Sequence, residues 1–205
     1  MTAGKRLMDI GLALLLGLLL FVPIILIAIA VLMIDGRPVF YASKRMKAPG
    51  QSFTLWKFRT MTSKERDASV SAAYKQDRIT PIGRMLRQRR LDELPQLWNI
   101  LRGDMSFVGP RPPLPRFVRL RPEIYAKVLK NRPGVTGLAT LVYHRREESM
   151  LSRCYSQSET DDTYLRRCIP AKAKIDMIWS RNRSICFDAV LIFRTVQRVF
   201  AFNKK

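Results

Sequence analysis

An adjacent pair of carboxylates, Asp92 and Glu93, has the residue types needed for catalysis. Neighbouring side chains on a helix point about 100° apart, so the two cannot face each other across a substrate like the acid and base of a glycosidase. At the start of a helix, the positive end of the helix dipole would keep Asp92 ionised and attract phosphate, while Glu93 could hold a divalent cation. A carboxylate held in this way is suited to attack phosphorus. Judged by spacing alone, a simple helix cap is the commoner role for Asp92.

A set of basic residues could bind the phosphate groups of such a reaction. The candidates are Lys57, Arg59, Arg87 and Arg111. Arg111 lies between Pro110 and Pro112, so its guanidinium would lose little entropy on binding a phosphate. Any single one could equally be a solvated surface charge, because the chain has 37 Lys and Arg residues.

The one histidine and the three cysteines do not form a recognisable site. They are His144, Cys154, Cys168 and Cys186. Their spacing fits neither a zinc site, nor a Cys–His nucleophile pair, nor a disulfide framework. A reducing compartment is the simplest interpretation.

Length and charge limit the class of protein further. The chain has 205 residues, which suits one domain, and its 47% hydrophobic content is enough for a core. Its formal net charge is +21. No known DNA-binding or RNA-binding motif is present, so nucleic acid is not an expected partner, and anionic lipid headgroups explain the charge better.

A membrane element is indicated by the 25 uncharged residues from Ile10 to Ile34. Pro23 predicts a kink inside this segment. Each half would be about 18 to 20 Å long, which is short of the roughly 30 Å hydrocarbon core. Basic residues flank both ends and favour the same, cytoplasmic side for both. A bent helix that enters and leaves one leaflet and a kinked single-pass helix both remain open on these features.

The following residues contain the elements that must position the candidate site. Residues 37–42 and 53–59 predict a β-hairpin around a turn at residues 48–50. Thr80 followed by Pro81 predicts a helix start. A second helix is expected to begin near Asp92 and to end at Gly103.

The rest of the chain gives weaker signals. Four prolines between residues 110 and 115 predict an extended or turning loop. The polar stretch from 145 to 162 is the best candidate for a flexible insertion. Residues 187–202 are amphipathic and predict a helix that packs in the core or lies on a membrane surface.

Four motifs, in order, resemble those of one family. They are Lys57-Phe58-Arg59-Thr60-Met61, the run from Leu91 to Ser106, Val108-Gly109-Pro110-Arg111-Pro112, and Arg132-Pro133-Gly134-Val135-Thr136-Gly137. The chain resembles the bacterial sugar transferases, the monotopic phosphoglycosyl transferases that begin glycan assembly on polyprenyl phosphate. The similarity extends from Lys5 to Thr195, which is nearly the whole sequence.

The resemblance implies a reaction. A UDP-sugar and Mg²⁺ would bind at the cytoplasmic face of the membrane, and Asp92 would attack the β-phosphorus and expel UMP. The phosphosugar would then pass from the enzyme to polyprenyl phosphate. Glu93 would join Asp92 in holding the metal. Lys57, Arg59, Arg87 and Arg111 would neutralise the phosphates.

The resemblance also implies a fold and a location. It predicts an α+β, mostly helical protein in which residues 1–36 form a re-entrant membrane helix kinked at Pro23. Residues 37–205 would form a cytoplasmic catalytic domain with a short β-hairpin and amphipathic surface helices. The location would be the bacterial inner membrane, and the chain looks like the small catalytic-core form. A homodimer stays open as its oligomeric state.

The chain departs from the family pattern at Ser43-Lys44-Arg45-Met46-Lys47, where Gln-x-Arg-x-Gly is usual, and at Asp176-Met177-Ile178-Trp179, where Asp-x-x-Tyr is usual. Two further departures affect the membrane helix and the substrate loop. Val22-Pro23 replaces the usual Ser-Pro at the helix break, so the proline must bend the helix without a hydroxyl. The sequence after Ala139 also differs, and Arg145 stands one place later than the family arginine. Arg145 is retained as a candidate substrate ligand, and no particular sugar is assigned.

A rival hypothesis needs no catalysis. The chain could be a basic membrane adaptor that binds anionic lipid or a partner protein. A third alternative is a related enzyme that has lost activity through the changed 140–145 region.

Overall fold

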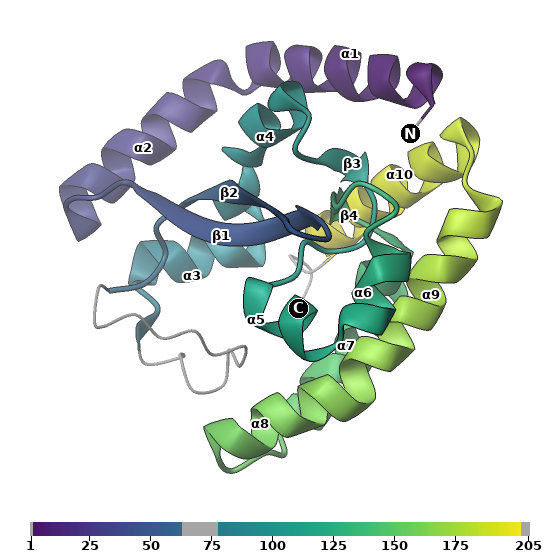
Figure 1. The fold of residues 1–205 in the computed structure, drawn as a ribbon. Coiled ribbons are helices and arrows are strands. Elements are labelled where there is room, and N and C mark those ends of the chain that lie inside the picture. The colour runs from purple at the N-terminus through teal and green to yellow at the C-terminus, as the bar shows by residue number, and fades with distance from the viewer. Residues whose placement is uncertain (1, 63–77, 202–205) are drawn as a thin grey trace.

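A computed structural model describes residues 2–62 and 78–201 of the chain. This part is mostly helical and holds two small sheets, one antiparallel and one parallel (Figure 1). The helices are α1 (Ala3–Leu19), α2 (Phe21–Asp35), α3 (Pro81–Gln88), α4 (Gln96–Arg102), α5 (Pro115–Leu120), α6 (Pro122–Val128), α7 (Leu138–Leu151), α8 (Gln157–Thr163), α9 (Ile169–Asn182) and α10 (Ile185–Ala201). The strands are β1 (Phe40–Ala48), β2 (Gln51–Phe58), β3 (Ser106–Val108) and β4 (Gly134–Thr136); a 3-10 turn, η2, spans Leu91–Glu93, and a π-helical turn, η3, spans Tyr164–Cys168.

Helices α1 and α2 form a pair bent by 63°. The break lies at Leu20, one turn before the predicted position at Pro23. A proline has no N–H for the carbonyl four residues earlier and its ring clashes with that carbonyl, so the disturbance falls at Leu19 and Leu20. The helical ladder resumes where the Ile24 amide donates to the Leu20 carbonyl at 2.8 Å.

The bent pair has the composition of a membrane element only when its two helices are taken together. Among residues 2–62 and 78–201, no single helix is both long and apolar enough to cross a bilayer, whereas the pair passes that test jointly. Figure 1 shows the pair as an arc along one side of the molecule. Large apolar side chains on it are exposed, including Leu18 (78%) and Met33 (80%).

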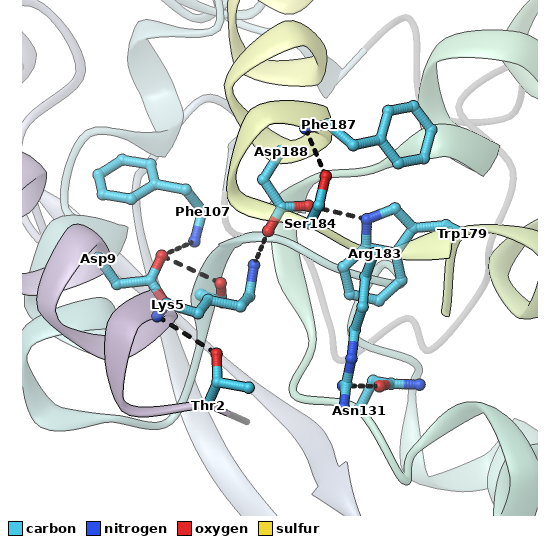
Figure 2. A network of polar contacts seen from close by, with 11 residues as sticks. Thr2, Lys5, Asp9, Phe107, Asn131, Trp179, Arg183, Ser184, Phe187 and Asp188 are labelled. Atoms are coloured by element: carbon cyan, nitrogen blue, oxygen red, sulfur yellow. Dashed lines mark hydrogen bonds and ion pairs between the residues drawn. The ribbon is translucent and has the colours of Figure 1, made fainter. Parts of the chain in front are cut away.

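A polar network attaches α1 to the rest of the fold (Figure 2). Lys5 and Asp9 lie one helical turn apart on the inner face of α1, and both are buried. Lys5 forms a buried ion pair with Asp188 of α10, whose other oxygen accepts a 2.9 Å hydrogen bond from the Trp179 indole. Asp9 accepts hydrogen bonds from the Ser106 hydroxyl at 3.1 Å and from the backbone N–H of Phe107.

The far end of α2 is attached to the same body. The Arg59 guanidinium donates to the backbone carbonyls of Asp35, Gly36 and Arg37. The Thr80 hydroxyl donates to the Asp35 carboxylate at 2.7 Å. Both ends of the bent pair are therefore held by one folded domain.

The predicted hairpin is confirmed. Strands β1 and β2 pair antiparallel from Phe40 opposite Phe58 to Ala48 opposite Gln51. Gly50, in the turn, has a φ of +74°, which favours glycine. Alternation along β2 directs Phe53 and Leu55 into the main core.

Helix starts and ends followed the local signals in part. Thr80 caps α3, since its hydroxyl accepts the Gly83 amide at 3.0 Å, and Gly103 ends α4 in a left-handed conformation. The predicted C-terminal helix is present as α10.

The prediction of an irregular, flexible insertion at 145–162 is wrong about secondary structure, because α7 continues to Leu151 and α8 follows. Arginine and glutamate at 145–148 favour a helix, and Ser156 caps α8 by accepting the Glu159 amide.

Candidate active site

Asp92 and Glu93 lie in the 3-10 turn η2, not at the start of an α-helix as predicted. Pro95 has no N–H to donate to the Leu91 carbonyl, so the Leu94 amide bonds that carbonyl instead, at 3.2 Å. Helix α4 then begins at Gln96. The electrostatic environment of Asp92 is consequently set mainly by nearby side chains.

The turn and strand β2 are fixed against each other by Asn99 of α4. Its side-chain oxygen accepts the Trp56 amide at 3.1 Å, and its nitrogen donates to the Thr54 carbonyl at 2.8 Å. This buried amide holds the η2–α4 segment beside β2. Lys57 is thereby placed next to the carboxylate pair.

Glu93 is held by three cations. The Lys57 Nζ lies 2.7 Å from Glu93 Oε1, and the Arg90 Nη2 lies 3.1 Å from Oε2. The Arg111 Nη2 lies 3.7 Å from Oε1. Both carboxylate oxygens of Glu93 are thus engaged.

Asp92 is buried beside this group but is only loosely bound. Its Oδ2 lies 3.6 Å from the Lys57 Nζ, and it accepts no hydrogen bond from any residue that the structure describes. Burial raises the pKa of Asp92, against the attraction of Lys57. Burial would also raise the pKa of Glu93, but the charges of Lys57, Arg90 and Arg111 outweigh it and hold that pKa below its usual range. The two neighbours are shifted in opposite directions.

Backbone contacts fix the loop that carries Arg111. The Gly134 amide donates to the Pro110 carbonyl at 2.9 Å, and the Met46 amide donates to the Pro113 carbonyl at 3.1 Å. A Cβ on Gly134 would come within 2.1 Å of the Gly109 nitrogen, so this close approach of two motif segments needs glycine. Arg111 is therefore presented by a rigid loop.

Arg87 reaches the same place from α3. Its Nε donates to the Thr60 hydroxyl at 2.8 Å. Burial lowers the pKa of Arg87, and the negative charge of Asp92 opposes that shift, which places the two groups near each other. Of the predicted ligands, Lys57, Arg87 and Arg111 therefore gather around Asp92 and Glu93.

Two other predicted ligands do not join this cluster. Arg59 follows the end of β2 at Phe58, so strand alternation no longer directs it beside Lys57, and its guanidinium clamps the end of α2. Arg145 lies exposed on α7, where the sequence had suggested a loop. Their predicted contacts with phosphate stay predictions.

A comparison with family models identifies the family of the chain. The model of the bacterial sugar transferase family matches residues 1–202. The chain belongs to the bacterial sugar transferase family.

Several curated members of the sugar transferase family are similar to the chain. A UDP-glucose:undecaprenyl-phosphate glucose-1-phosphate transferase of Klebsiella pneumoniae is 36% identical over 200 residues, which cover 96% of the chain and 40% of the relative. The exopolysaccharide production protein ExoY of Rhizobium meliloti (strain 1021) is 34% identical over 213 residues, or 96% of the chain and 85% of the relative. An uncharacterized sugar transferase, EpsL, of Bacillus subtilis (strain 168) is 44% identical over 138 residues, which cover 67% of each. The chain thus spans 40% of the length of the Klebsiella relative.

Sequence reasoning missed two arginines of this sugar transferase site. Arg90, which pairs with Glu93, adopts a left-handed backbone with a φ of 54°, uncommon outside glycine. Its spacing of three residues from Glu93 was the available signal. Arg45 lines the pocket beside Lys57, Glu93 and Arg111, and burial together with the charge of Arg111 lowers its pKa to about 10. Strand β1 carries Arg45 to the site from 48 positions before Glu93.

The donor set is compatible with a magnesium ion that is shared with a substrate. No group of three or more His, Cys, Asp or Glu side chains that could hold a metal occurs in the described ranges. Mg²⁺ commonly binds one or two carboxylates together with substrate phosphates. Asp92 and Glu93 supply such a pair, with Asp92 the less engaged of the two.

Proposed function

We propose that this chain transfers a sugar-1-phosphate from a UDP-sugar to polyprenyl phosphate, giving polyprenyl-diphospho-sugar and UMP. Relatives with this type of reaction in their names, such as the Klebsiella transferase, support it at the level of reaction class. The observation that carries the proposal is the unequal treatment of the two carboxylates. Glu93 is paired with Lys57, Arg90 and Arg111, whereas Asp92 lies buried beside them and accepts no hydrogen bond from the described residues.

The unequal environments assign different roles to the two side chains. Glu93 holds Lys57, Arg90 and Arg111 in fixed positions around the pocket. Asp92 is the nucleophile, because its oxygen can approach a phosphorus atom without first losing a hydrogen bond. The cations exceed the carboxylates in number, so the site attracts a diphosphate.

The reaction would proceed in two displacements. A carboxylate oxygen of Asp92 forms a bond to the β-phosphorus, and the bond from that phosphorus to the bridging oxygen breaks, so UMP leaves with the bridging oxygen. A phosphate oxygen of the lipid then attacks the same phosphorus, and the Asp92 carboxylate departs. Lys57, Arg87 and Arg111 stabilise the charge that develops on the phosphoryl oxygens in both steps.

We propose Mg²⁺ as the cofactor, held by Asp92 and Glu93 together with the substrate. When bound, it would neutralise charge on the diphosphate. Chelation with EDTA is expected to abolish UMP formation, and added Mg²⁺ is expected to restore it.

We also propose that residues 1–36 insert into the cytoplasmic membrane as a re-entrant pair and that residues 37–205 stay on its cytoplasmic face. Helices of 17 and 15 residues are about 25 and 22 Å long, less than the roughly 30 Å hydrocarbon core. The attachment of both ends to one domain, through Lys5 and through Asp35, supports entry and exit on the same side.

The topology can be tested by labelling single cysteines in a variant from which Cys154, Cys168 and Cys186 have been removed. Ala3 and Lys44 flank the pair and are exposed, so each is replaced by cysteine in turn. We expect a membrane-impermeant thiol reagent to reach both positions from the cytoplasmic side. Access from opposite sides would show that the segment crosses the membrane.

The activity is tested by measuring UMP release from a panel of UDP-sugars with polyprenyl phosphate and Mg²⁺. We expect the native chain to use one or a few of these donors. Asp92→Asn should reduce the rate at least about 1,000-fold, as expected for loss of an activated nucleophile. The matched control is Asp161→Asn, which removes the carboxylate paired with Arg116 at 2.8 Å on the distant helix α8 (Figure 1). UMP release that survives Asp92→Asn would rule out the covalent mechanism.

A further inference from the structure

A groove of about 390 Å³ lies between α7 and α10, apart from the carboxylate cluster. Its apolar lining is aliphatic throughout: Leu138, Leu141, Val142 and Leu191. Its polar lining consists of three arginines, which are Arg145, Arg194 and Arg198. An aliphatic surface next to clustered guanidinium groups matches a ligand that has a hydrocarbon part and an anionic part.

The positive charge of the groove is not neutralised locally. Within the part of the chain that the structure describes, Arg145 and Arg194 form no ion pair with a carboxylate. Arg198 donates to a neutral group, the Leu141 carbonyl, at 2.8 Å. Burial lowers the pKa of Arg198, and the charges of Arg145 and Arg90 lower it further, with Glu148 opposing. An incoming phosphate would relieve this repulsion.

Strand β4 connects the groove to the catalytic pocket. Gly134 and Val135 line the pocket together with Glu93 and Arg111. The next residue, Thr136, shares a 2.7 Å hydrogen bond with Thr195 of α10. Thr195 lies between two of the groove arginines in sequence, so the groove adjoins the site where phosphoryl transfer would take place.

The surroundings of the groove suit a membrane lipid better than a nucleotide. Val142, Phe193 and Val196 are exposed on α7 and α10, with exposed fractions of 65%, 62% and 46%. The lining has no aromatic ring to stack on a uracil base and no amide or hydroxyl side chain to hydrogen-bond its edge. A phosphate monoester with an aliphatic chain has the required chemistry.

We propose that the α7–α10 groove binds the acceptor lipid, with its phosphate on the three arginines and its first isoprene units on the aliphatic side chains. This inference rests on the proposed function for the identity of the lipid. A phosphate monoester carries up to two negative charges, whereas a phosphodiester lipid carries one. Three arginines therefore match the charge of the monoester better. Arg145 thereby acts on the acceptor and not on the nucleotide.

Binding is tested first, without catalysis. The whole 205-residue chain in detergent micelles is melted with added undecaprenyl phosphate, with phosphatidylglycerol at the same concentration, or with inorganic phosphate. A ligand that binds only the folded state raises the melting temperature. We expect undecaprenyl phosphate to stabilise the native chain, the Arg145→Gln/Arg194→Gln variant to lose that stabilisation, and Arg181→Gln, an exposed arginine on α9, to retain it. The same shift in the double variant, or equal shifts with phosphatidylglycerol or inorganic phosphate, would overturn the proposal.

The two half-reactions are then measured separately, which distinguishes an effect on acceptor binding from an effect on donor binding. The double variant should form UMP normally in a single turnover without acceptor, but its KM for polyprenyl phosphate should rise at least tenfold. A loss of UMP formation in the first half-reaction would instead place the nucleotide in the groove and overturn the assignment. If no UDP-sugar yields UMP although the arginine-dependent lipid binding persists, the lipid-binding assignment of the groove is supported and the proposed reaction is refuted. If UMP forms but the lipid does not bind in the groove, the proposed reaction is supported and the assignment of the groove is refuted.

Discussion

Asp188 and Asp92 both lie buried beside a lysine, but the two environments differ in how completely they satisfy the carboxylate. Asp188 pairs with Lys5 through one oxygen and accepts the Trp179 indole N–H through the other. Among the described residues, Asp92 has a single ion pair, with Lys57 at 3.6 Å, and accepts no hydrogen bond. The first arrangement leaves nothing for a ligand to bind, while the second leaves an oxygen available. The same residue types thus build a structural joint in one region and a reactive site in the other.

Loss of Lys5 should break the structural joint and produce the largest effect. Lys5→Met leaves Asp188 charged and buried without its partner, which typically costs about 3–5 kcal/mol. We expect a large fall in the melting temperature in detergent micelles, with kcat unchanged below the transition. The double variant Lys5→Met/Asp188→Asn should recover most of the loss, because asparagine carries no charge and still accepts from Trp179. A normal melting temperature with a reduced kcat would assign Lys5 to the reactive site.

Loss of Lys57 should lower the reaction rate and leave the melting temperature nearly unchanged. Lys57→Met removes the cation shared by Asp92 and Glu93, and loss of one group that stabilises developing charge typically costs about 100-fold to 1,000-fold in rate. The measurement is the single-turnover rate of UMP formation, with the melting temperature measured alongside. Lys47→Met is the control, because Lys47 lies on the same hairpin and pairs with Asp104 at 2.8 Å. Equal losses in the two variants would mean that charge in general, and not its position, supports the reaction.

A smaller effect is expected in the pH dependence of UMP formation, which reports on the environment of Asp92. Burial raises the pKa of Asp92, and a protonated carboxyl is not nucleophilic, so UMP formation should rise with pH through a value above the ordinary 3.9 or so of aspartate. Glu93→Gln removes a neighbouring negative charge that adds to this shift, so the rise should move to lower pH in that variant. The single-turnover rate is measured from pH 4 to 8 for both proteins. A rise that stays in place or moves upward would contradict the assignment of the titration to Asp92.

Signals confined to a few residues predicted much of this architecture. The structure confirms three boundaries that local signals predicted: the helix start at Thr80-Pro81, the hairpin turn before Gln51, and the helix end at Gly103. Such signals suffice because capping and turn geometry depend on neighbours in sequence. The carboxylate pair and three of its cations were also found. Arg59 was grouped with Lys57 because both fall within the strand predicted at 53–59, whereas β2 ends at Phe58.

Contacts between distant residues could not be predicted in this way. Lys5 meets Asp188 across 183 positions, and neither residue carries a local sign of the other. Arg45 enters the site because β1 packs against the Arg111 loop, where the Arg45 guanidinium donates to the Pro112 carbonyl at 3.2 Å. The family motifs mark which residues matter, whereas the packing decides which carboxylate is satisfied and which is left open.

The most direct measurement is the mass of the intact protein after incubation with a competent UDP-sugar and Mg²⁺ in the absence of polyprenyl phosphate. We expect a sugar-phosphate adduct that maps to the peptide containing Asp92 and disappears when polyprenyl phosphate is added. UMP release without any adduct, or an adduct on a residue other than Asp92, would contradict the assignment of Asp92 as the nucleophile.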